Sequence, residues 1–446
     1  MSQTRQLAWQ ALRRIRSEAS YSNLVLAKAR QSLERRDAQL LTQIVYGTLR
    51  NQRLIDAVIA EASSRPLAKV NADLLDLLRL SVYQILWLER VPKFAVVAEA
   101  VELAKKQRGQ AVAGFINAVL RKIDPSATER CLAVVPPDER LALRYSLPAE
   151  LDSLLAELLS DAQREALAKN WCQPAPLVLR CNLRRNTVAE LSATLCEQGG
   201  SVSPGRYAPA ALRVEGISEP FGSRPYLSGA FSAQDEAAQL CSLALGTLAP
   251  EARVLDACAG VGGKTCALLE AQPQLEVVAV DRSERKLELC REHLRRLGLA
   301  AECKVADVAR LVPSEIGNFD AILLDAPCSA LGVIGRHPEL KWRFQPTQIA
   351  ALAELQRRLL ESCWSLLRNG GVLVYSVCSL TRVEGEQQVQ RLLDQQRDAI
   401  LDPPNEHPFD QLWPTGRCGL TLWPHLHGTD GFFIARLRKI DEHFAD

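Results

Sequence analysis

Short apolar segments alternate with longer amphipathic segments through the second half of this chain of 446 residues. A buried parallel strand reads as a short apolar run, whereas a helix that covers a sheet repeats its apolar residues every three or four positions. The apolar runs are RVLDAC (253–258), VVAVD (277–281), ECKVAD (302–307), AILLDAP (321–327) and GVLVYSVC (371–378), and the main helical segments between them are 284–298 and 350–369. This alternation predicts a doubly wound parallel sheet, in which ligands bind beyond the carboxyl ends of the strands.

The first third of the chain has a different texture. Residues 74–89 and 94–107 place apolar side chains three and four positions apart, which predicts helices. Pro136, Pro137 and Pro148 then interrupt the helical pattern and indicate a boundary. We therefore expect an all-α bundle over residues 1–145.

Residues 146–233 are predicted to form a small α/β connecting module. Segments 177–182 and 211–216 have the composition of short strands, and 187–200 is typical of a helix that ends at glycines. The sheet domain would follow over residues 234–446, opening with a helix at 234–246. Its last two apolar segments, 421–425 and 431–439, are compatible with an antiparallel hairpin.

Composition narrows the class of protein. Hydrophobic residues make up 47% of the chain, yet no stretch reaches the ~18 uninterrupted apolar residues of a spanning helix, and the N-terminus has no apolar signal core. The 13 cysteines include no CxxC pair, so we expect reduced thiols, no disulfide framework and no metal site. These features predict a cytoplasmic protein, which we expect to be a monomer.

Charge is distributed unevenly along the chain. Residues 1–145 contain 23 Lys and Arg against 14 Asp and Glu, a net +9, and the remaining residues contain 31 against 38, a net −7. A basic segment of this kind favours contact with a polyanion such as RNA. A solvated helical surface is the alternative interpretation.

A glycine loop follows the first strand of the predicted sheet. It reads DACAGVGGKT (256–265) and leads directly into a helix, an arrangement that suits a nucleotide-like ligand. The loop does not match GxGxxG, and by itself it is equally compatible with NAD or with close packing alone. Asp281, at the end of the second strand, can accept hydrogen bonds from both ribose hydroxyls. Asp307, at the end of the third, is within reach of an adenine amino group, although either aspartate alone is compatible with helix capping.

Two cysteines and a further aspartate lie at the next two strand ends. Asp325 and Cys328 occur in LLDAPCS, and Cys378 occurs in VYSVCS. Methylation at C5 of a cytosine needs such a set, because C5 becomes nucleophilic only after a thiolate has added to C6. A carboxyl group beside N3 assists the attack, and a second group must promote release of the product. Asp325 fits the role of the carboxyl group beside N3. The two thiols fit the roles of the nucleophile and of the group that promotes release.

Most cysteines of the sheet domain are expected to serve packing. Cysteine is among the most frequently buried residue types and usually behaves as a small hydrophobe. Residues given this interpretation are Cys258, Cys266, Cys290, Cys303 and Cys363. Cys328 and Cys378 differ from these because they lie in polar loops at strand ends.

DAPCS followed by a later S-x-C-S resembles the signature of the NOP2/Sun family of RNA cytosine-5 methyltransferases. Segments 332–343, 427–437, 231–240 and 116–122 are similar to the RsmB (Fmu/Sun) branch of that family, so the resemblance covers essentially the whole chain. INAVLR and EAVELAKK resemble NusB-type RNA-binding bundles. The resemblance implies a NusB-like N-terminal domain, a small connecting module and a class I (Rossmann-like) methyltransferase domain.

The resemblance also implies the reaction and the roles of residues. It implies methyl transfer from S-adenosyl-L-methionine to a cytosine of 16S ribosomal RNA, free or in a partly assembled small subunit. Cys378 would be the nucleophile, Cys328 the releasing thiol, and Asp325 would face both the base and the cofactor. The implied cofactor contacts are Cys258, Ala259, Gly260, Val261, Gly262, Gly263, Lys264, Asp281, Asp307 and Asp325.

Two positions depart from the family pattern. Gly260 and Val261 stand where the family loop usually has Ala-Pro, which predicts a less rigid loop. Val377 stands where a threonine usually precedes the nucleophile. Neither departure removes a reacting group, so we expect activity to be retained.

A cluster of basic and aromatic residues follows Cys328 in the sequence. We expect His337, Lys341, Trp342 and Arg343 to hold phosphate and stack on a base of the substrate. A solvated rim is the alternative interpretation of such a cluster. Two other functions are compatible with the sequence. One is the same chemistry on transfer RNA or another ribosomal site, and the other is a non-catalytic, NusB-like RNA-binding assembly factor.

Overall fold

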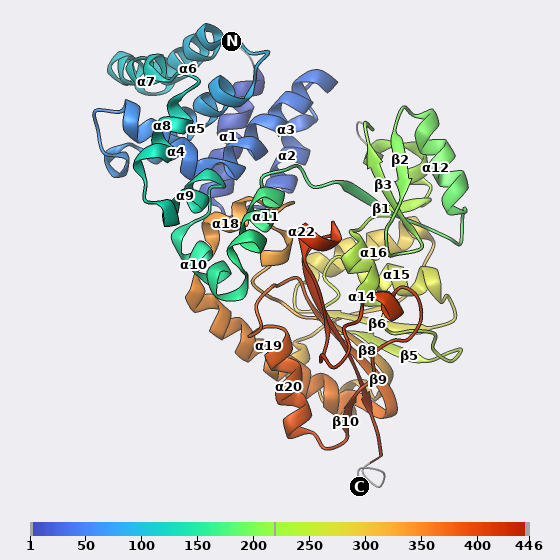
Figure 1. The fold of residues 1–446 in the computed structure, drawn as a ribbon. Helices are drawn as coiled ribbons and strands as arrows, with labels where there is room; N and C mark the ends of the chain where they lie inside the picture. The colour runs from blue at the N-terminus through green and yellow to red at the C-terminus, as the bar shows by residue number, and fades with distance from the viewer. Residues whose placement is uncertain (1–2, 218–219, 442–446) are drawn as a thin grey trace. The chain divides into compact units, whose positions relative to one another are not determined.

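The computed structural model describes residues 3–217 and 220–441, and the chain forms two compact units (Figure 1). The first unit runs to Pro174 and also includes the later segment Ile334–Phe344. The second comprises Ala175–Val333 and the described residues from Gln345 onward. Segment Ile334–Phe344 therefore leaves the second unit, packs in the first and returns.

The first unit is entirely helical, as the periodicity predicted. Its helices are α1 (Gln3–Ser17), α2 (Ser22–Arg30), α3 (Arg35–Arg50), α4 (Gln52–Ala62), η1 (Leu67–Lys69), α5 (Ala72–Trp87), α6 (Lys93–Arg108), α7 (Gln110–Lys122), α8 (Ala127–Val134), α9 (Pro137–Arg144), α10 (Ala149–Leu158), α11 (Asp161–Trp171) and α18 (Glu339–Arg343). Helices α5 and α6 coincide with the segments predicted at 74–89 and 94–107.

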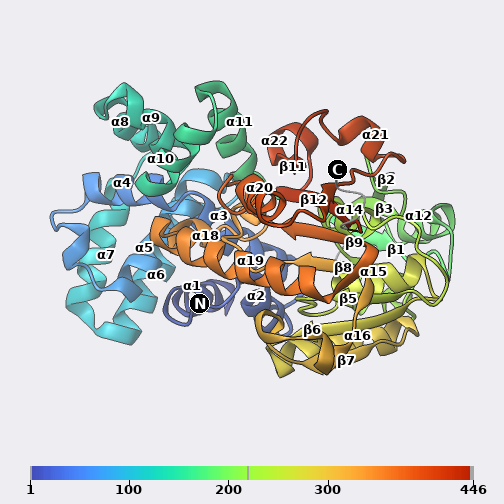
Figure 2. The same ribbon diagram turned by 90° about the horizontal axis from the view of Figure 1, so that it is seen from below.

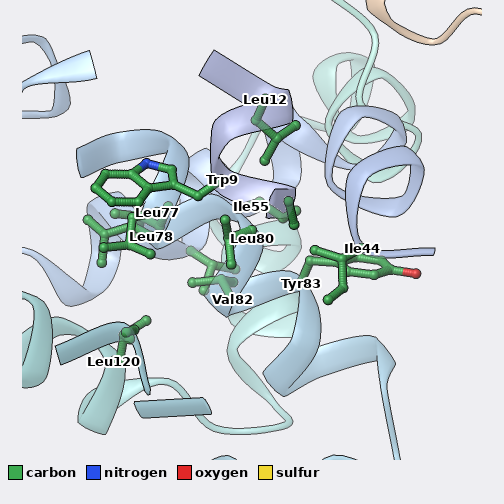
Figure 3. Close-up of a cluster of buried hydrophobic side chains, with 14 of the residues drawn as sticks. Trp9, Leu12, Ile44, Ile55, Leu77, Leu78, Leu80, Val82, Tyr83 and Leu120 are labelled. Carbon is green, nitrogen blue, oxygen red and sulfur yellow. The ribbon is translucent and has the colours of Figure 1, made fainter. Parts of the chain in front are cut away.

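Helix α5 lies in the core of this unit (Figure 3). Its Leu77 and Val82 are fully buried together with residues of α1, α3, α4 and α7. Tyr83 packs against Gly47 of α3, where an added Cβ would lie 1.9 Å from the tyrosine ring. A glycine is therefore required there for the two helices to approach.

The helical unit extends further than the sequence predicted. Pro137 begins α9, and Pro148 is the N-cap of α10. Proline suits a helix start because the first backbone N–H groups of a helix need no intrahelical partner. These prolines therefore begin new helices, and α10 and α11 cluster with the helical unit. The three-part division at residues 145 and 233 stays a prediction.

A small antiparallel sheet opens the second unit. Its strands are β1 (Leu177–Cys181), β2 (Ser201–Pro204), β3 (Ala211–Glu215) and β4 (Phe231–Ala233), in the order β2-β3-β1-β4, and its helices are α12 (Val188–Glu197), η2 (Pro220–Gly222) and α13 (Arg224–Leu227). Thr187 and Glu190 form a capping box that begins α12. The predicted strands 177–182 and 211–216 and the predicted helix 187–200 are confirmed.

The large sheet has the strand order β10-β12-β9-β8-β5-β6-β7, and β11 pairs with β12. Its strands are β5 (Arg253–Asp256), β6 (Glu276–Asp281), β7 (Glu302–Val305), β8 (Phe319–Asp325), β9 (Leu367–Val377), β10 (Ala399–Leu401), β11 (Leu420–Leu422) and β12 (Phe432–Lys439). Strands β5 to β9 are parallel, as predicted. Strand β12 runs antiparallel to β9, β10 and β11, and its pairing with β11 confirms the predicted hairpin.

Helices cover both faces of the large sheet (Figures 1 and 2). The helices of this part are α14 (Glu236–Leu243), α15 (Gly263–Ala271), α16 (Glu284–Leu297), η3 (Val308–Arg310), α17 (Pro313–Ile316), η4 (Leu331–Val333), α19 (Pro346–Leu366), α20 (Glu386–Gln395), α21 (Phe409–Leu412) and α22 (Pro424–His427). Val254 of β5 packs with α14, α15 and α16, and the next residue, Leu255, packs with α19 on the other face. Because successive strand residues point to opposite faces, continuous apolar runs fill both layers.

The strand order reverses direction between β5 and β8. The chain proceeds from β5 to β6 and β7 on one side, then returns to place β8 and β9 on the other side of β5. Loops that leave adjacent strands in opposite directions open a crevice at the carboxyl edge of a sheet. This edge carries the residues singled out from the sequence.

Candidate active site

The glycine loop connects β5 to α15 at the carboxyl edge of the large sheet. Gly260 and Gly262 both adopt positive φ angles, of +56° and +80°. A Cβ at Gly262 would lie 2.4 Å from the sulfur of Cys290, so this glycine lets α16 approach the loop. A Cβ at Gly260 would meet no atom closer than 4.0 Å, which leaves space beside the loop.

Asp281 and Asp307 lie after the two neighbouring parallel strands. Asp281 ends β6, where its Oδ2 accepts a hydrogen bond from the Gly260 N–H (3.0 Å) and its Oδ1 accepts one from the Ser283 N–H (2.8 Å). Asp307 is the N-cap of η3 and accepts a hydrogen bond from the Ala309 N–H at 3.2 Å. Both carboxylates therefore have local backbone partners, and Asp281 also fixes the glycine loop.

This part of the edge fits a nucleoside cofactor. It combines open space beside a left-handed glycine with two carboxylates at adjacent strand ends. Carboxylate oxygens accept hydrogen bonds from ribose hydroxyls and from amino groups. No group of acidic, histidine and cysteine side chains able to hold a metal ion occurs within the described part of the chain.

Cys328 and Cys378 meet at the same edge. Cys328 lies in the loop after β8 and Cys378 directly follows β9, and their sulfur atoms are 3.2 Å apart. Both side chains are partly buried. The parallel register that pairs Asp325 of β8 with Ser376 of β9 brings these two loops together.

The two loops are joined further by their backbones. The Gly332 N–H donates to the Cys378 carbonyl at 2.9 Å, and the Gly431 N–H donates to the Gly332 carbonyl at 2.8 Å. A Cβ at Gly332 would lie 1.9 Å from the Gly431 oxygen, so only glycine allows this approach. Three loops that are distant in sequence thus fix the position of the two thiols.

Asp325 faces the glycine loop from the end of β8. Its Oδ2 accepts a hydrogen bond from Lys264 Nζ at 2.6 Å, and its Oδ1 accepts one from Ser376 Oγ at 3.1 Å. Burial alone would lower the pKa of Lys264, but the charge of Asp325, the hydrogen bond to it and the neighbouring Cys241 and Asp256 together raise it. The side chain of Asp325 is 30% exposed, which leaves it accessible to a ligand.

The thiol of Cys328 holds its proton strongly. Its pKa is raised well above the usual range by the hydrogen bond with Cys378, then by burial and by the negative charge of Glu384. A protonated Cys328 can donate to the Cys378 sulfur. The geometry allows either sulfur to donate this hydrogen bond, and the raised pKa of Cys328 favours Cys328 as the donor.

The cysteines assigned to packing are mostly buried. Cys266, Cys290 and Cys363 lie in the two cores of the sheet domain, as predicted. Cys258 and Cys303 are only partly buried. Cys258 follows β5 within the glycine loop, and burial raises its pKa well above the usual range.

The predicted substrate contact is wrong for Lys341, and the other three residues of this cluster also contact the helical unit. Lys341 is fully buried and its Nζ donates to the Arg50 carbonyl at 2.8 Å, while Trp342 Nε1 donates to the Leu49 carbonyl at 2.8 Å. Arg343 donates to two further carbonyls of the helical unit. His337 lies beside Glu339 and packs edge-on against a tyrosine. These groups are used by the helical unit, which the linear sequence did not reveal.

Buried Lys341 gives a testable pH dependence of stability. Burial lowers its pKa from 10.5 to about 8, so between these pH values the unfolded chain binds more protons than the folded one. The free energy of unfolding therefore rises with pH in this window, by about 2 kcal/mol between pH 7.5 and 9.5. We expect urea unfolding to show this rise in the wild type but not in Lys341→Met. The difference between their free energies of unfolding should therefore change with pH.

The matched control for this prediction is Lys286→Met, since the Lys286 side chain is 57% exposed. This variant should follow the pH dependence of the wild type. A difference between wild type and Lys341→Met that stays constant from pH 7.5 to 9.5 would contradict the prediction.

Two buried carboxylates of the site were not among the residues predicted from the sequence. Asp256, at the end of β5, accepts a hydrogen bond from Thr265 Oγ1 at 2.6 Å, and burial raises its pKa to about 6. Glu384 accepts hydrogen bonds from residues of both cysteine loops. The serine that follows each cysteine, Ser329 and Ser379, was the available signal for this second group.

Two family models and several relatives match this chain. Residues 244–438 match the family model described as "16S rRNA methyltransferase RsmB/F", and residues 2–125 match the NusB family. A protein of Bacillus subtilis named probable ribosomal RNA small subunit methyltransferase B is 35% identical over 98% of both chains. Its Vibrio cholerae counterpart, named without "probable", is 37% identical over 94% of this chain and 93% of the relative.

A solved structure extends the likeness to the fold. The crystal structure of the protein PH0851 covers 98% of each chain with a TM-score of 0.84 at 26% identity. The resemblance found in the sequence is confirmed, as are the NusB-like helical part and the Rossmann-like methyltransferase domain. The chain belongs to the RsmB/F family of 16S rRNA methyltransferases.

Proposed function

We propose that this protein transfers a methyl group from S-adenosylmethionine to C5 of a cytosine in 16S ribosomal RNA. The family and the names of its relatives support ribosomal RNA as the substrate. The observation that carries the chemistry is the pair of sulfur atoms 3.2 Å apart, with Asp325 at the neighbouring strand end.

The cofactor would be held by the glycine loop and the acidic strand ends. The residues assigned to it are 258–264, Asp281, Asp307 and Asp325, which lie along one edge of the sheet. When bound there, S-adenosylmethionine supplies an electrophilic methyl group. Lys264 helps to orient this region because its ammonium group joins the loop to Asp325.

Cys378 is assigned as the nucleophile. Its thiolate adds to C6 of the cytosine, which forms an S–C6 bond and moves electron density to C5. Asp325 is positioned to assist at N3, where charge develops during the attack. Ser376 and Lys264 hold the two oxygens of this carboxylate in place.

Cys328 is assigned to release. After the C5 proton has left to a base, the S–C6 bond breaks and its electron pair returns to the Cys378 sulfur. The retained thiol of Cys328, 3.2 Å away, stabilises this departing thiolate by donating a hydrogen bond. The order in which the two cysteines act rests on the family resemblance.

The helical unit is assigned to RNA binding. Its match to the NusB family and the net charge of +9 over residues 1–145 support contact with a polyanion. A target base must be unstacked before it can reach the thiols, which costs least in loops and single strands. No helix in the described ranges is both long and apolar enough to cross a bilayer. A cytoplasmic monomer stays our prediction.

Two competing functions remain distinguishable. Transfer RNA or another ribosomal site would use the same catalytic residues, whereas an assembly factor without catalysis would not need two adjacent thiols beside Asp325. We expect purified protein and S-adenosylmethionine to produce one new 5-methylcytosine in unmethylated 16S RNA, detected by bisulfite sequencing. Transfer RNA serves as the parallel substrate. Modification confined to transfer RNA would reject the ribosomal assignment, and absence of 5-methylcytosine in both would reject the chemistry.

A further inference from the structure

The side chain of Glu384 accepts hydrogen bonds from both cysteine loops. Its Oε1 accepts from the Ser329 N–H (2.8 Å) and from Gln356 Nε2 (3.1 Å). Its Oε2 accepts from Ser329 Oγ (2.5 Å), Ser379 Oγ (2.5 Å) and Thr381 Oγ1 (3.0 Å). Glu384 is fully buried, and all of these donors are neutral groups. Its charge is therefore satisfied by these neutral donors.

The donors lie immediately beside the reactive thiols. Ser329 follows Cys328 and Ser379 follows Cys378, and their hydroxyl oxygens are 3.0 Å apart while both contact the same carboxylate oxygen. The sulfurs are held 3.2 Å apart one residue away. A single carboxylate thus joins two loops that are separated by 50 positions in the sequence.

Neighbouring elements fix Glu384 itself. Tyr375 of β9 donates its hydroxyl to the Glu384 carbonyl at 2.6 Å. Gln356 of α19 donates to the Pro327 carbonyl at 2.9 Å as well as to Glu384, so it holds the Cys328 loop from its other side. Gln356 and Tyr375 are both fully buried. The carboxylate therefore has a fixed position from which to orient the loops.

We propose that Glu384 is a positioning residue that sets the separation of the Cys328 and Cys378 sulfurs. This inference rests on the proposed function for its catalytic meaning, because the distance matters to methylation only if both thiols take part. Its geometric part is independent of substrate and cofactor. Loss of the carboxylate would leave the hydroxyls of Ser329 and Ser379 without their shared acceptor, and the two loops would separate.

The test measures how readily the two thiols can be joined. Diamide oxidises neighbouring thiols to a disulfide and is itself reduced to the hydrazine, and sulfurs 3.2 Å apart need little movement to reach the bond length of about 2.05 Å. Full-length wild type, Glu384→Ala and Glu384→Gln are treated without RNA or cofactor, and the linked Cys328–Cys378 peptide is quantified by mass spectrometry. We expect coupling to slow at least about tenfold in Glu384→Ala, with partial rescue in Glu384→Gln.

Glu386→Ala is the matched control, because this carboxylate lies two positions away and its side chain is 32% exposed. It should couple at the wild-type rate. In methylation assays Glu384→Ala should lower kcat about 100-fold with little change in KM, since a displacement near 1 Å can cost this much. If Glu384→Ala does not fold, the Ser329→Ala/Ser379→Ala double variant keeps the carboxylate and should show the same slow coupling.

Coupling at the wild-type rate in a folded Glu384→Ala protein, or in the serine double variant, would overturn the inference. The result stays separate from the proposed function. If wild type forms no 5-methylcytosine while Glu384→Ala couples slowly, the geometric role stands and the methylation chemistry is rejected. If wild type methylates RNA and Glu384→Ala retains full kcat, the positioning role is rejected and the chemistry stands.

Discussion

Replacement of Cys378 by alanine is expected to abolish methyl transfer, with a fall in rate of about 10⁴-fold or more. Without a thiolate at this position nothing adds to C6, and C5 of the cytosine stays a poor nucleophile. Cys328 is 3.2 Å away in the wild type, and burial and the negative charge of Glu384, which both remain in the variant, still raise its pKa. It is therefore a poor substitute for the missing nucleophile. Transfer of a labelled methyl group to 16S RNA measures the effect.

Cys196→Ala is the control for this variant. Cys196 is exposed and lies in helix α12, which packs on the small sheet rather than at the carboxyl edge of the large one. It should retain the wild-type rate. Circular dichroism and thermal unfolding establish that Cys378→Ala is folded. A folded Cys378→Ala protein that still methylates RNA at more than a few per cent of the wild-type rate would exclude Cys378 as the nucleophile.

Replacement of Cys328 by alanine is expected to leave a covalent protein–RNA complex that persists, whereas Cys378→Ala should form none. Attack by Cys378 and methylation at C5 require no group from Cys328, so both steps should proceed. Release should stall, because the departing thiolate loses the hydrogen bond that Cys328 donates across 3.2 Å. Denaturing electrophoresis with labelled RNA should show a slowly migrating protein–RNA adduct. The RNA in this adduct should be methylated only when S-adenosylmethionine is present.

The double variant Cys328→Ala/Cys378→Ala is the negative control for the adduct, because it lacks both thiols. It should form none, since the nucleophile has been removed. An adduct that persists in Cys378→Ala and is absent from Cys328→Ala would reverse the two assignments. The two single variants together therefore decide the order of action, which until then rests on resemblance.

Much of the sheet domain followed from local sequence. The apolar runs that end at Asp256, Asp281 and Asp325 were recognisable because buried parallel strands have a distinct composition. Their polar ends had to share one edge once the strands were parallel. The positions of Cys328 and Cys378 at that edge were predictable for the same reason.

The prediction failed where a segment packs on distant residues. Lys341 and Trp342 have the composition of a phosphate-binding rim, yet they are hydrogen-bonded to the backbone at Arg50 and Leu49. Such carbonyls are present in every residue, so no local pattern marks the partner. Local sequence does not say to which unit α10 and α11 belong, because a proline begins a helix as readily as it ends one.

The sequence alone determined which residues reach the carboxyl edge of the sheet, because strand periodicity and strand direction are local properties of the chain. Only the tertiary structure decided that two sulfurs from loops 50 positions apart lie 3.2 Å from one another. That distance depends on the pairing of β8 with β9, on the contact of Gly332 with Gly431 and on the buried carboxylate of Glu384. Each of these joins residues remote in sequence, and their hydrogen bonds are strengthened where the surrounding core excludes water.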